Sequence, residues 1–213
     1  DLLGLKGSTD VYDMANDPMY KAGMGTSTDG GKVAFFGQRS GTTDTAIFVR
    51  TPVVPGITGS PPPNTTPAQQ SVPLVKVGDT VQGGATIQKF RQGIALRTIT
   101  NTSKQEVAFV AEVKELDGTI KTNIYVSVPG STPRLVAKGE DYGEFAPGLT
   151  MNKNGEVAFT AKDATGVANV YKATTPGNVV SLTEGSVNGV KFEAPSINNG
   201  GKVSFTTKDG EIG

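Results

Sequence analysis

One eight-residue pattern recurs four times along the chain, and it constrains the fold more than any other feature. Its copies are TDGGKVAF at 28–35, TSKQEVAF at 102–109, NKNGEVAF at 152–159 and NNGGKVSF at 198–205. Each copy joins a polar, turn-forming segment to a short apolar segment that suits a β-strand. A chain that repeats a turn and a strand in this way is expected to build one supersecondary unit several times.

The spacing of the copies defines the size of that unit. Val107, Val157 and Val203 hold the same place in three copies and stand 50 and 46 residues apart. The larger gap from Val33 to Val107 includes a proline-rich stretch at 51–73, which we interpret as an exposed inserted loop, partly polyproline-like. The predicted units are then about 24–94, 95–148 and 149–195, with a fourth made of 196–213 plus 1–23.

Within each unit, Gly, Pro and Asn turns separate three or four short apolar segments, as in an antiparallel meander. The fourth unit stops at Gly213 just after its first strand, and the N-terminal segment supplies the missing pattern. Residues 2–9 align with 125–132, and residues 10–14 align with the strand that follows. We therefore predict an all-β propeller of about four four-stranded blades. One blade is shared between the two ends and closes either within the chain or between subunits.

Composition narrows the function classes. The chain has no Cys and no His, which removes disulfides, thiolate zinc sites and any Ser-His-Asp triad. Its 20 basic and 20 acidic residues form no basic run, so we expect no nucleic-acid partner. No run of 18 apolar residues occurs, so we expect no membrane insertion, and we predict no cofactor. The chain begins at Asp1 without signal-peptide features, and we expect a mature or excised fragment.

The four copies resemble the tandem NxxGxxAF-type repeats of exported bacterial proteins and, more distantly, the blades of TolB-like propellers. Asn152 with Gly155, and Asn198 with Gly201, match that motif. The copy at 28–31 lacks the Asn, and the copy at 102–105 lacks both residues. The resemblance implies a propeller-like fold and a secreted or cell-surface location in a bacterium. It implies no particular activity.

The Asn-Gly turns of the motif have two interpretations. Asn and Gly accept the positive φ of tight hairpins, and Asx oxygens can also bind calcium. The turns at 152–155 and 198–201 lack the alternating Asp pattern of a calcium loop. We favour the turn and predict no metal site.

The densest group of carboxylates beside an aromatic residue lies at 140–144. Paired carboxylates can cleave glycosidic bonds, and a tyrosine can support a bound sugar, although a solvated loop is the interpretation that we favour. The same rim of the predicted propeller carries further acidic and tyrosine side chains. The candidate binding residues are Glu140, Asp141, Tyr142, Glu144, Asp13, Asp17, Tyr20 and Asp79.

A phenylalanine ends each copy of the motif, at Phe35, Phe109, Phe159 and Phe205. We predict that these four rings pack in the core between neighbouring blades. Phe36 is an additional ring that should face the opposite side of its strand, because side chains alternate along a strand.

The leading functional hypothesis is a non-enzymatic structural or interaction module. The split fourth unit leads to a sharper version, in which copies of the chain assemble head to tail by strand complementation. One alternative is a carbohydrate-cleaving enzyme that uses Glu140, Asp141 or Glu144. Another is a lectin-like binder that uses Tyr142 and Tyr20. The expected partners are therefore proteins, including further copies of the chain, or a glycan.

Overall fold

The structure is a computed structural model that describes residues 26–29, 32–38, 45–50, 73–100, 102, 104–174, 178–183, 191–192 and 194–208. This part of the chain contains antiparallel strands and one short 3-10 helix, η1 (Gly139–Asp141), and it has no α-helix. The prediction of an all-β fold is confirmed. The proline-rich stretch up to Val72 and the whole N-terminal segment, residues 1–25, lie outside the described residues.

Three four-stranded antiparallel meanders follow one another along the chain. The first sheet consists of β1 (Thr26–Asp29), β2 (Lys32–Gln38), β3 (Thr45–Arg50) and β4 (Val75–Lys76). The second consists of β5 (Thr86–Thr98), β6 (Gln105–Lys114), β7 (Ile120–Ser127) and β8 (Arg134–Lys138). The third consists of β9 (Phe145–Met151), β10 (Val157–Lys162), β11 (Ala168–Thr174) and β12 (Asn178–Ser181).

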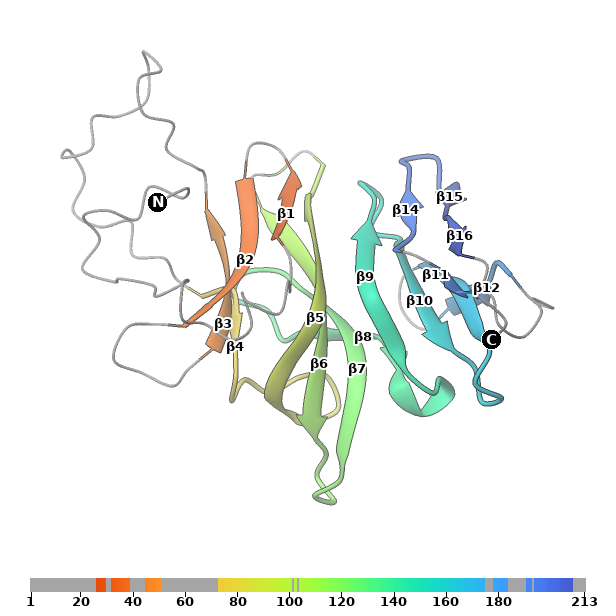
Figure 1. Cartoon of the computed structure of the whole chain (residues 1–213). Coiled ribbons are helices and arrows are strands. Elements are labelled where there is room, and N and C mark those ends of the chain that lie inside the picture. Colours follow the sequence, from red (N-terminus) through yellow and green to blue (C-terminus); the bar gives the residue numbers. More distant parts are fainter. Residues whose placement is uncertain are drawn as a thin grey trace, which may run out of the picture.

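Two short ladders, which we call the terminal hairpins, follow the third sheet. They pair β13 (Lys191–Phe192) with β16 (Thr207–Lys208), and β14 (Ser196–Ile197) with β15 (Val203–Ser204). Figure 1 shows the three sheets side by side, with the first sheet and the terminal hairpins at opposite ends of the row. The described parts of the chain therefore form an open row.

The same strand register recurs in every sheet, because the repeated motif always forms the second strand. Its phenylalanine lies opposite an aromatic residue on the third strand, and the two rings are stacked 5.5 to 6.0 Å apart. These cross-strand pairs are Phe35–Phe48, Phe109–Tyr125 and Phe159–Tyr171. The first strand adds a second ring at an edge-to-face angle, in the pairs Phe90–Phe109, Phe145–Phe159 and Phe192–Phe205.

The middle of strand β6 is buried on both faces, which explains why its sequence is apolar without interruption from Val107 to Ala111. Val107 and Phe109 belong to a core cluster shared with the first sheet, and Ala108 and Val110 belong to a cluster shared with the third sheet. A strand segment that alternates between two apolar cores favours apolar residues on both faces. The sheets are therefore packed face to face, each against its neighbour.

Two of the four motif phenylalanines lie in cores between sheets, as predicted: Phe109 in the core shared with the first sheet and Phe159 in the core shared with the second. Phe35 is buried, but it belongs to neither of these two cores. Phe35, Phe109 and Phe159 are at most 1% exposed, but Phe205 is 37% exposed. The prediction for Phe205 was wrong because the terminal hairpins contain only the first two strands of the meander among the described residues. Phe36 does face opposite to Phe35, since it packs against Phe90 at 5.6 Å in the core shared with the second sheet.

The first strands of successive sheets approach one another closely, and two glycines at positive φ permit this. In β5, three residues after Phe90 lie opposite the single residue Val110, and the last of them is Gly93 with φ 121°. Strand β9 has the same bulge, which ends at Gly148 with φ 105°. A Cβ atom on Gly148 would lie only 2.3 Å from that of Ala194, so this contact with the terminal hairpins requires glycine.

Candidate functional site

The structure brings three of the predicted binding residues together. Glu140 lies in η1, while Tyr142 and Glu144 lie in the link between η1 and β9, and all three line one hollow. Asp141 is also in η1, but it does not line the hollow.

The other predicted binding residues are not part of this group. Asp79 lies in the turn after β4, where its carboxylate accepts a hydrogen bond from the backbone nitrogen of Lys76 at 2.9 Å. Asp13, Asp17 and Tyr20 lie outside the described residues.

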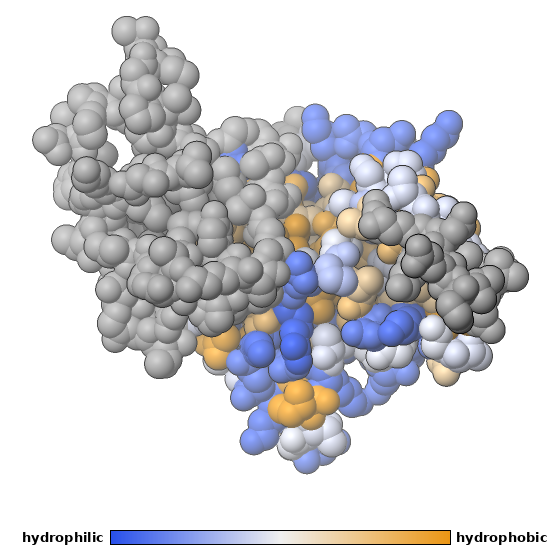
Figure 2. Space-filling model, viewed as in Figure 1, coloured by the Kyte–Doolittle hydropathy of each residue, from blue (hydrophilic) through white to orange (hydrophobic). Residues whose placement is uncertain are grey.

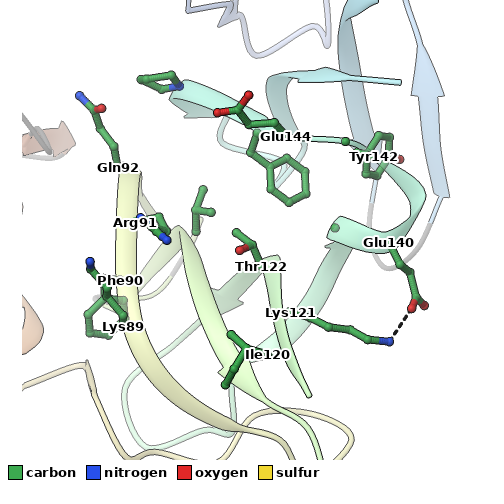
Figure 3. A pocket seen from close by; sticks show the side chains of 15 residues that line it. Lys89, Phe90, Arg91, Gln92, Ile120, Lys121, Thr122, Glu140, Tyr142 and Glu144 are labelled. Carbon is green, nitrogen blue, oxygen red and sulfur yellow. Dashed lines mark hydrogen bonds and ion pairs between the residues drawn. The ribbon is translucent and has the colours of Figure 1, made fainter. Parts of the chain in front are cut away.

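The hollow has a volume of about 780 Å³ and opens beside the bulge of β5 (Figure 3). Its walls come from the bulge, from the start of β7, and from the segment between η1 and β9. Apolar side chains, including Phe90, Val110 and Phe145, share the lining with charged ones such as Lys89 and Lys121. A ligand that combines polar and apolar surface would suit such a lining.

Lysines hold the two carboxylates of the hollow in the ionised form. Glu140 pairs with Lys121 at 2.5 Å and with Lys138 at 3.3 Å, and the hydrogen bond from Lys121 lowers the pKa of Glu140. Glu144 pairs with Lys162 at 2.8 Å, and that hydrogen bond lowers the pKa of Glu144. Neither group therefore holds a proton near neutral pH, whereas glycosidic hydrolysis requires one protonated carboxyl group.

The ring of Tyr142 packs into the core of the third sheet. Its centroid lies 4.8 Å from that of Tyr171 and 5.7 Å from those of Phe145 and Phe159. Burial, with smaller contributions from Asp141 and Tyr171, raises the pKa of Tyr142 to about 12. A tyrosine that serves as a stacking platform for a sugar needs an open ring face, whereas this ring already has three aromatic neighbours.

A second candidate surface lies where the third sheet faces the terminal hairpins. On β8, Val136 and Ala137 are only 6% and 4% exposed, because the third sheet covers them. At the corresponding edge of the third sheet, Val180 is 47% exposed and Leu182 is 41% exposed. Val180 lies opposite Lys172 in the register, so it faces away from the second sheet. The third sheet thus keeps an uncovered apolar margin, and Phe205 in the terminal hairpins is exposed as well.

Another pair of exposed apolar residues provides a comparison. Leu116 is 84% exposed and Ile120 is 55% exposed, and both lie at the β6–β7 hairpin. Figure 2 shows apolar side chains at the lower end of the molecule, over this hairpin. These residues are far from the terminal hairpins in Figure 1 and can serve as controls.

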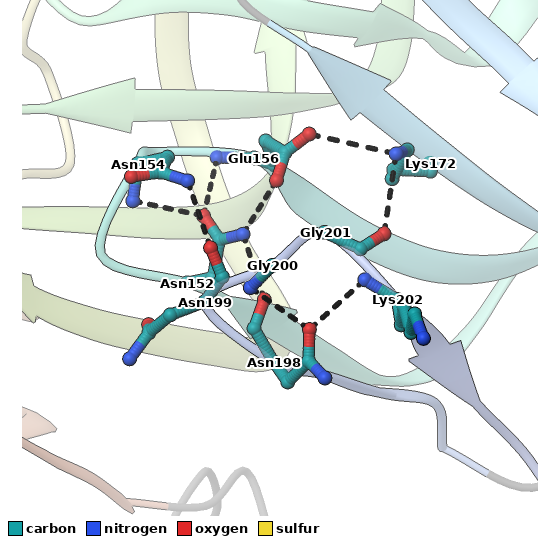
Figure 4. Close-up of polar contacts among 9 residues, drawn as sticks. All are labelled: Asn152, Asn154, Glu156, Lys172, Asn198, Asn199, Gly200, Gly201 and Lys202. Atoms are coloured by element: carbon teal, nitrogen blue, oxygen red, sulfur yellow. Dashed lines mark hydrogen bonds and ion pairs between the residues drawn. The ribbon is translucent and has the colours of Figure 1, made fainter.

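The repeated motif forms a third feature, a ladder of stacked turns (Figure 4). The Oδ1 atom of Asn152 accepts hydrogen bonds from the backbone nitrogens of Asn154 and Glu156, both at 3.0 Å. In the next turn, the Oδ1 atom of Asn198 likewise accepts hydrogen bonds from the backbone nitrogens of Gly200 at 2.9 Å and Lys202 at 3.0 Å. Each turn also contains a glycine at positive φ, with 83° at Gly155 and 75° at Gly201. The Asn and Gly of the motif therefore form the turn, as predicted.

Hydrogen bonds connect each turn to the next one along the row. Asn152 donates through Nδ2 to the carbonyl oxygen of Asn198 at 2.9 Å, and Asn154 donates to that of Asn199 at 2.9 Å. One sheet earlier, Arg97 donates through Nη1 to the carbonyl oxygen of Lys153 at 2.5 Å. Arg97 occupies the position in the second sheet that Asn152 occupies in the third, because Arg97 lies opposite Glu106 across the hairpin as Asn152 lies opposite Glu156. The second and third sheets thus each donate hydrogen bonds forward to the next turn.

The turn at 99–104 has a different form, which explains why this copy lacks the Asn and Gly. The pairing of β5 with β6 extends to Thr98 and Gln105. Beyond that pair, the backbone nitrogen of Ile99 donates a hydrogen bond to the carbonyl oxygen of Lys104. The hydroxyl of Thr102 accepts a hydrogen bond from the nitrogen of Lys104 at 3.2 Å. The longer hairpin therefore needs no side-chain amide to close it.

Sequence reasoning missed the first-strand bulge and the lysine partners of the carboxylates. The bulge does have a signal in the sequence, because each of the two bulged strands has a phenylalanine followed three residues later by a glycine, at 90–93 and 145–148. Lys121 lies 19 residues from Glu140 and Lys162 lies 18 residues from Glu144, and only the meander brings each pair together.

The described residues contain no group of three or more metal-binding side chains and no helix long and apolar enough to cross a membrane. Comparison of the chain with protein-family models, with curated proteins and with solved structures found no match.

Proposed function

We propose that this protein is a non-enzymatic structural module that assembles head to tail, with each copy completing the last unit of the copy before it. The observation that carries the proposal is the exposure of three apolar side chains in the last part of the described chain, Val180 and Leu182 at the edge of the third sheet and Phe205 in the terminal hairpins. In the two preceding units, third and fourth strands cover the equivalent surface. An unfilled place of this kind is what strand complementation requires.

The proposed fold is a propeller-like row in which the three sheets and the terminal hairpins are successive blades. The shared register, the face-to-face packing and the contact between first strands support this interpretation. In the terminal hairpins, Ile197 pairs with Val203 as Met151 pairs with Val157 in the third sheet. The hairpins thus begin a fourth blade in the correct register, and two strands remain to be added.

The proposed source of those two strands is the N-terminal segment of another copy. Residues 2–9 align with 125–132, so Leu2 takes the place of Tyr125, which stacks on Phe109. Leu2 would then cover Phe205, and residues 10–14 would lie over Val180 and Leu182. Another copy is favoured because the first sheet and the terminal hairpins stand at opposite ends of the row (Figure 1).

The test measures the mass of the full chain in solution by light scattering over a range of concentrations. We expect multimers that grow with concentration. The double variant Val180→Ser/Leu182→Ser should weaken association about 30-fold, because about 2 kcal/mol of apolar burial is lost. The control variant Leu116→Ser/Ile120→Ser changes two apolar side chains that are more exposed than Val180 and Leu182, and it should assemble like the parent chain. A parent chain that stays monomeric at every concentration would sink the proposal.

A carbohydrate ligand in the hollow is the second candidate function, which the mixed polar and apolar lining of that hollow favours. Binding is favoured over cleavage because both carboxylates are ionised. A glycan array with the full chain, compared with the variant Thr122→Trp that fills the hollow, tests it. Binding that the variant loses supports the carbohydrate function, and equal binding by both chains contradicts it.

The proposed location is the bacterial cell surface or the exterior, which rests on the resemblance of the motif to repeats of exported proteins. The absence of Cys and the neutral net charge are compatible with that location. Fractionation of cells that produce the complete gene product would test it.

A further inference from the structure

The fourth strand of each sheet forms an outer edge, and two of these three edges are capped. On β4, the backbone nitrogen of Lys76 donates to the carboxylate of Asp79 at 2.9 Å. On β8, the nitrogen of Leu135 donates to the side-chain oxygen of Gln82 at 3.0 Å, and the nitrogen of Gln82 donates to the carbonyl oxygen of Pro133 at 2.9 Å. Groups that occupy an edge in this way keep a further strand from pairing there.

The outer edge of the third sheet, strand β12, has no such cap among the described residues. The backbone nitrogen of Leu182 donates inward to the carbonyl oxygen of Val170 at 2.8 Å. Because inward and outward groups alternate along an antiparallel strand, the backbone groups of Val179 and Ser181 point outward. In the described part of the chain, no strand lies beyond β12 and no hydrogen bond reaches these groups.

The links that precede the sheets explain the difference. Gln82 belongs to the link at 77–85, between β4 and β5. The equivalent link between β8 and β9 spans only 139–144, and the nitrogen of Gly143 in it donates to Lys162 in β10 at 2.8 Å. The shorter link therefore bonds to the second strand of its sheet, and β12 keeps its outward groups.

The sequence of this edge suits pairing with a second copy of itself. Strand β12 reads NVVS, without a charge or a proline, so two copies meet without like-charge repulsion. The outward groups of Val179 and Ser181 lie symmetrically about Val180, whose side chain is largely exposed. In an antiparallel pair, Val179 would bond with the partner's Ser181, and the two Val180 side chains would lie directly opposite each other on one face.

We infer that two copies of the chain pair antiparallel along β12, so that their third sheets form one eight-stranded sheet around a two-fold axis. A second copy fits better than a strand of another sequence, because a closed two-fold pair buries the same exposed valine from both sides. The inference goes beyond the head-to-tail assembly. That assembly covers the face of the third sheet, whereas this pairing uses its edge and joins two rows side by side.

Single cysteine variants test the register, since the chain has no cysteine of its own. Val180→Cys places two thiols directly opposite each other, and an added oxidant should link most of the protein into a covalent dimer on a non-reducing gel. Leu182→Cys is the register control, because its two thiols would lie about 13 Å apart along the strands and should not link. Leu116→Cys controls for random collisions, since that side chain is more exposed than either.

Ser181→Pro tests the backbone hydrogen bonds. Proline removes the outward donor and keeps the inward ladder, and the lost hydroxyl makes no hydrogen bond with any described residue. The pair should associate about 30-fold more weakly, because the two-fold axis removes two hydrogen bonds at once. The urea midpoint should stay close to that of the parent chain. The matched control is Ser181→Ala, which loses the same hydroxyl but keeps the nitrogen donor and should associate like the parent chain.

Light scattering separates this inference from the proposed function. If multimers of the parent chain grow with concentration, but Val180→Cys does not link and Ser181→Pro leaves their mass unchanged, the edge pairing is wrong and head-to-tail assembly stands. If the parent chain stops at a dimer that Val180→Cys traps and Ser181→Pro abolishes, the edge pairing stands and head-to-tail assembly is wrong. Linking of Leu182→Cys as strongly as Val180→Cys overturns the register, and a monomeric parent chain contradicts both proposals.

Discussion

The junction between the second and third sheets and the junction between the third sheet and the terminal hairpins use the same motif with opposite results. At the first junction, Phe159 stacks on Tyr171 and is 1% exposed. At the second, Phe205 meets only Phe192 among the described aromatic rings and is 37% exposed. The motif alone therefore does not bury its phenylalanine. Burial requires the third and fourth strands of the same unit.

The largest expected effect separates these two phenylalanines. Phe159→Ala leaves a cavity among Tyr142, Phe145 and Tyr171, and it should lower the free energy of unfolding by about 3–5 kcal/mol. Phe205→Ala should cost about 1 kcal/mol or less in the isolated chain, because the ring is already partly in water. Urea unfolding followed by circular dichroism measures both. Equal losses would mean that the last unit is as complete as the third.

A smaller effect is expected where the first strands meet. Gly148→Ala forces a side chain into a positive-φ position and against Ala194, and it should cost about 2–3 kcal/mol. The control is Gly118→Ala, at φ 87° in a hairpin where no atom lies within 4 Å of the new Cβ, and it should cost only about 1 kcal/mol. Urea midpoints that fall equally for both variants would contradict a tight junction between β9 and the terminal hairpins.

The turn ladder offers the next comparison. Asn152 is 3% exposed, and Asn152→Ala removes an acceptor from two backbone nitrogens and a donor to Asn198, which should cost about 2 kcal/mol. Asn198→Ala affects an exposed turn and should cost about 0.5–1 kcal/mol. Thermal unfolding of the two variants measures the difference. A larger loss for Asn198→Ala would mean that the outer turn is already buried by a partner.

The smallest expected effect concerns the loss of folding stability at acidic pH. The pKa values of Glu140 and Glu144 are lowered in the folded state by their lysine partners, so their contribution to stability is complete above the ordinary Glu range and is lost as the pH falls through it. Both side chains are exposed to water, which screens the ion pairs. The double variant Glu140→Gln/Glu144→Gln should therefore flatten the acid limb of a plot of urea midpoint against pH only slightly. A steep loss would mean that these carboxylates are more buried than their surroundings indicate.

The sequence predicted the repeated elements of this fold well because their signal is local. The turn at 152–155 and the apolar strand after it are both written in eight consecutive residues. The alternation of Phe35 and Phe36 likewise follows from the period of a strand.

The candidate site was harder to predict because it depends on residues that are distant in the chain. The hollow forms only where the bulge of β5 meets the link before β9. Likewise, Tyr142 appeared to be a rim residue, but Phe159 and Tyr171 draw its ring into the core. Nothing near Tyr142 in the sequence indicates these neighbours.

Face-to-face packing of each sheet only against its neighbours has a consequence for local opening. In a one-dimensional array, a unit is held by its own bonds and by the interfaces on its two sides, and a unit with one interface opens first. The second sheet has an interface on both faces, whereas the terminal hairpins are described with one. Amide hydrogens should therefore exchange with deuterium most slowly in β6 and fastest in β14 and β15. A chain that gains a neighbour at that end should slow the exchange there and leave the rate in β6 unchanged.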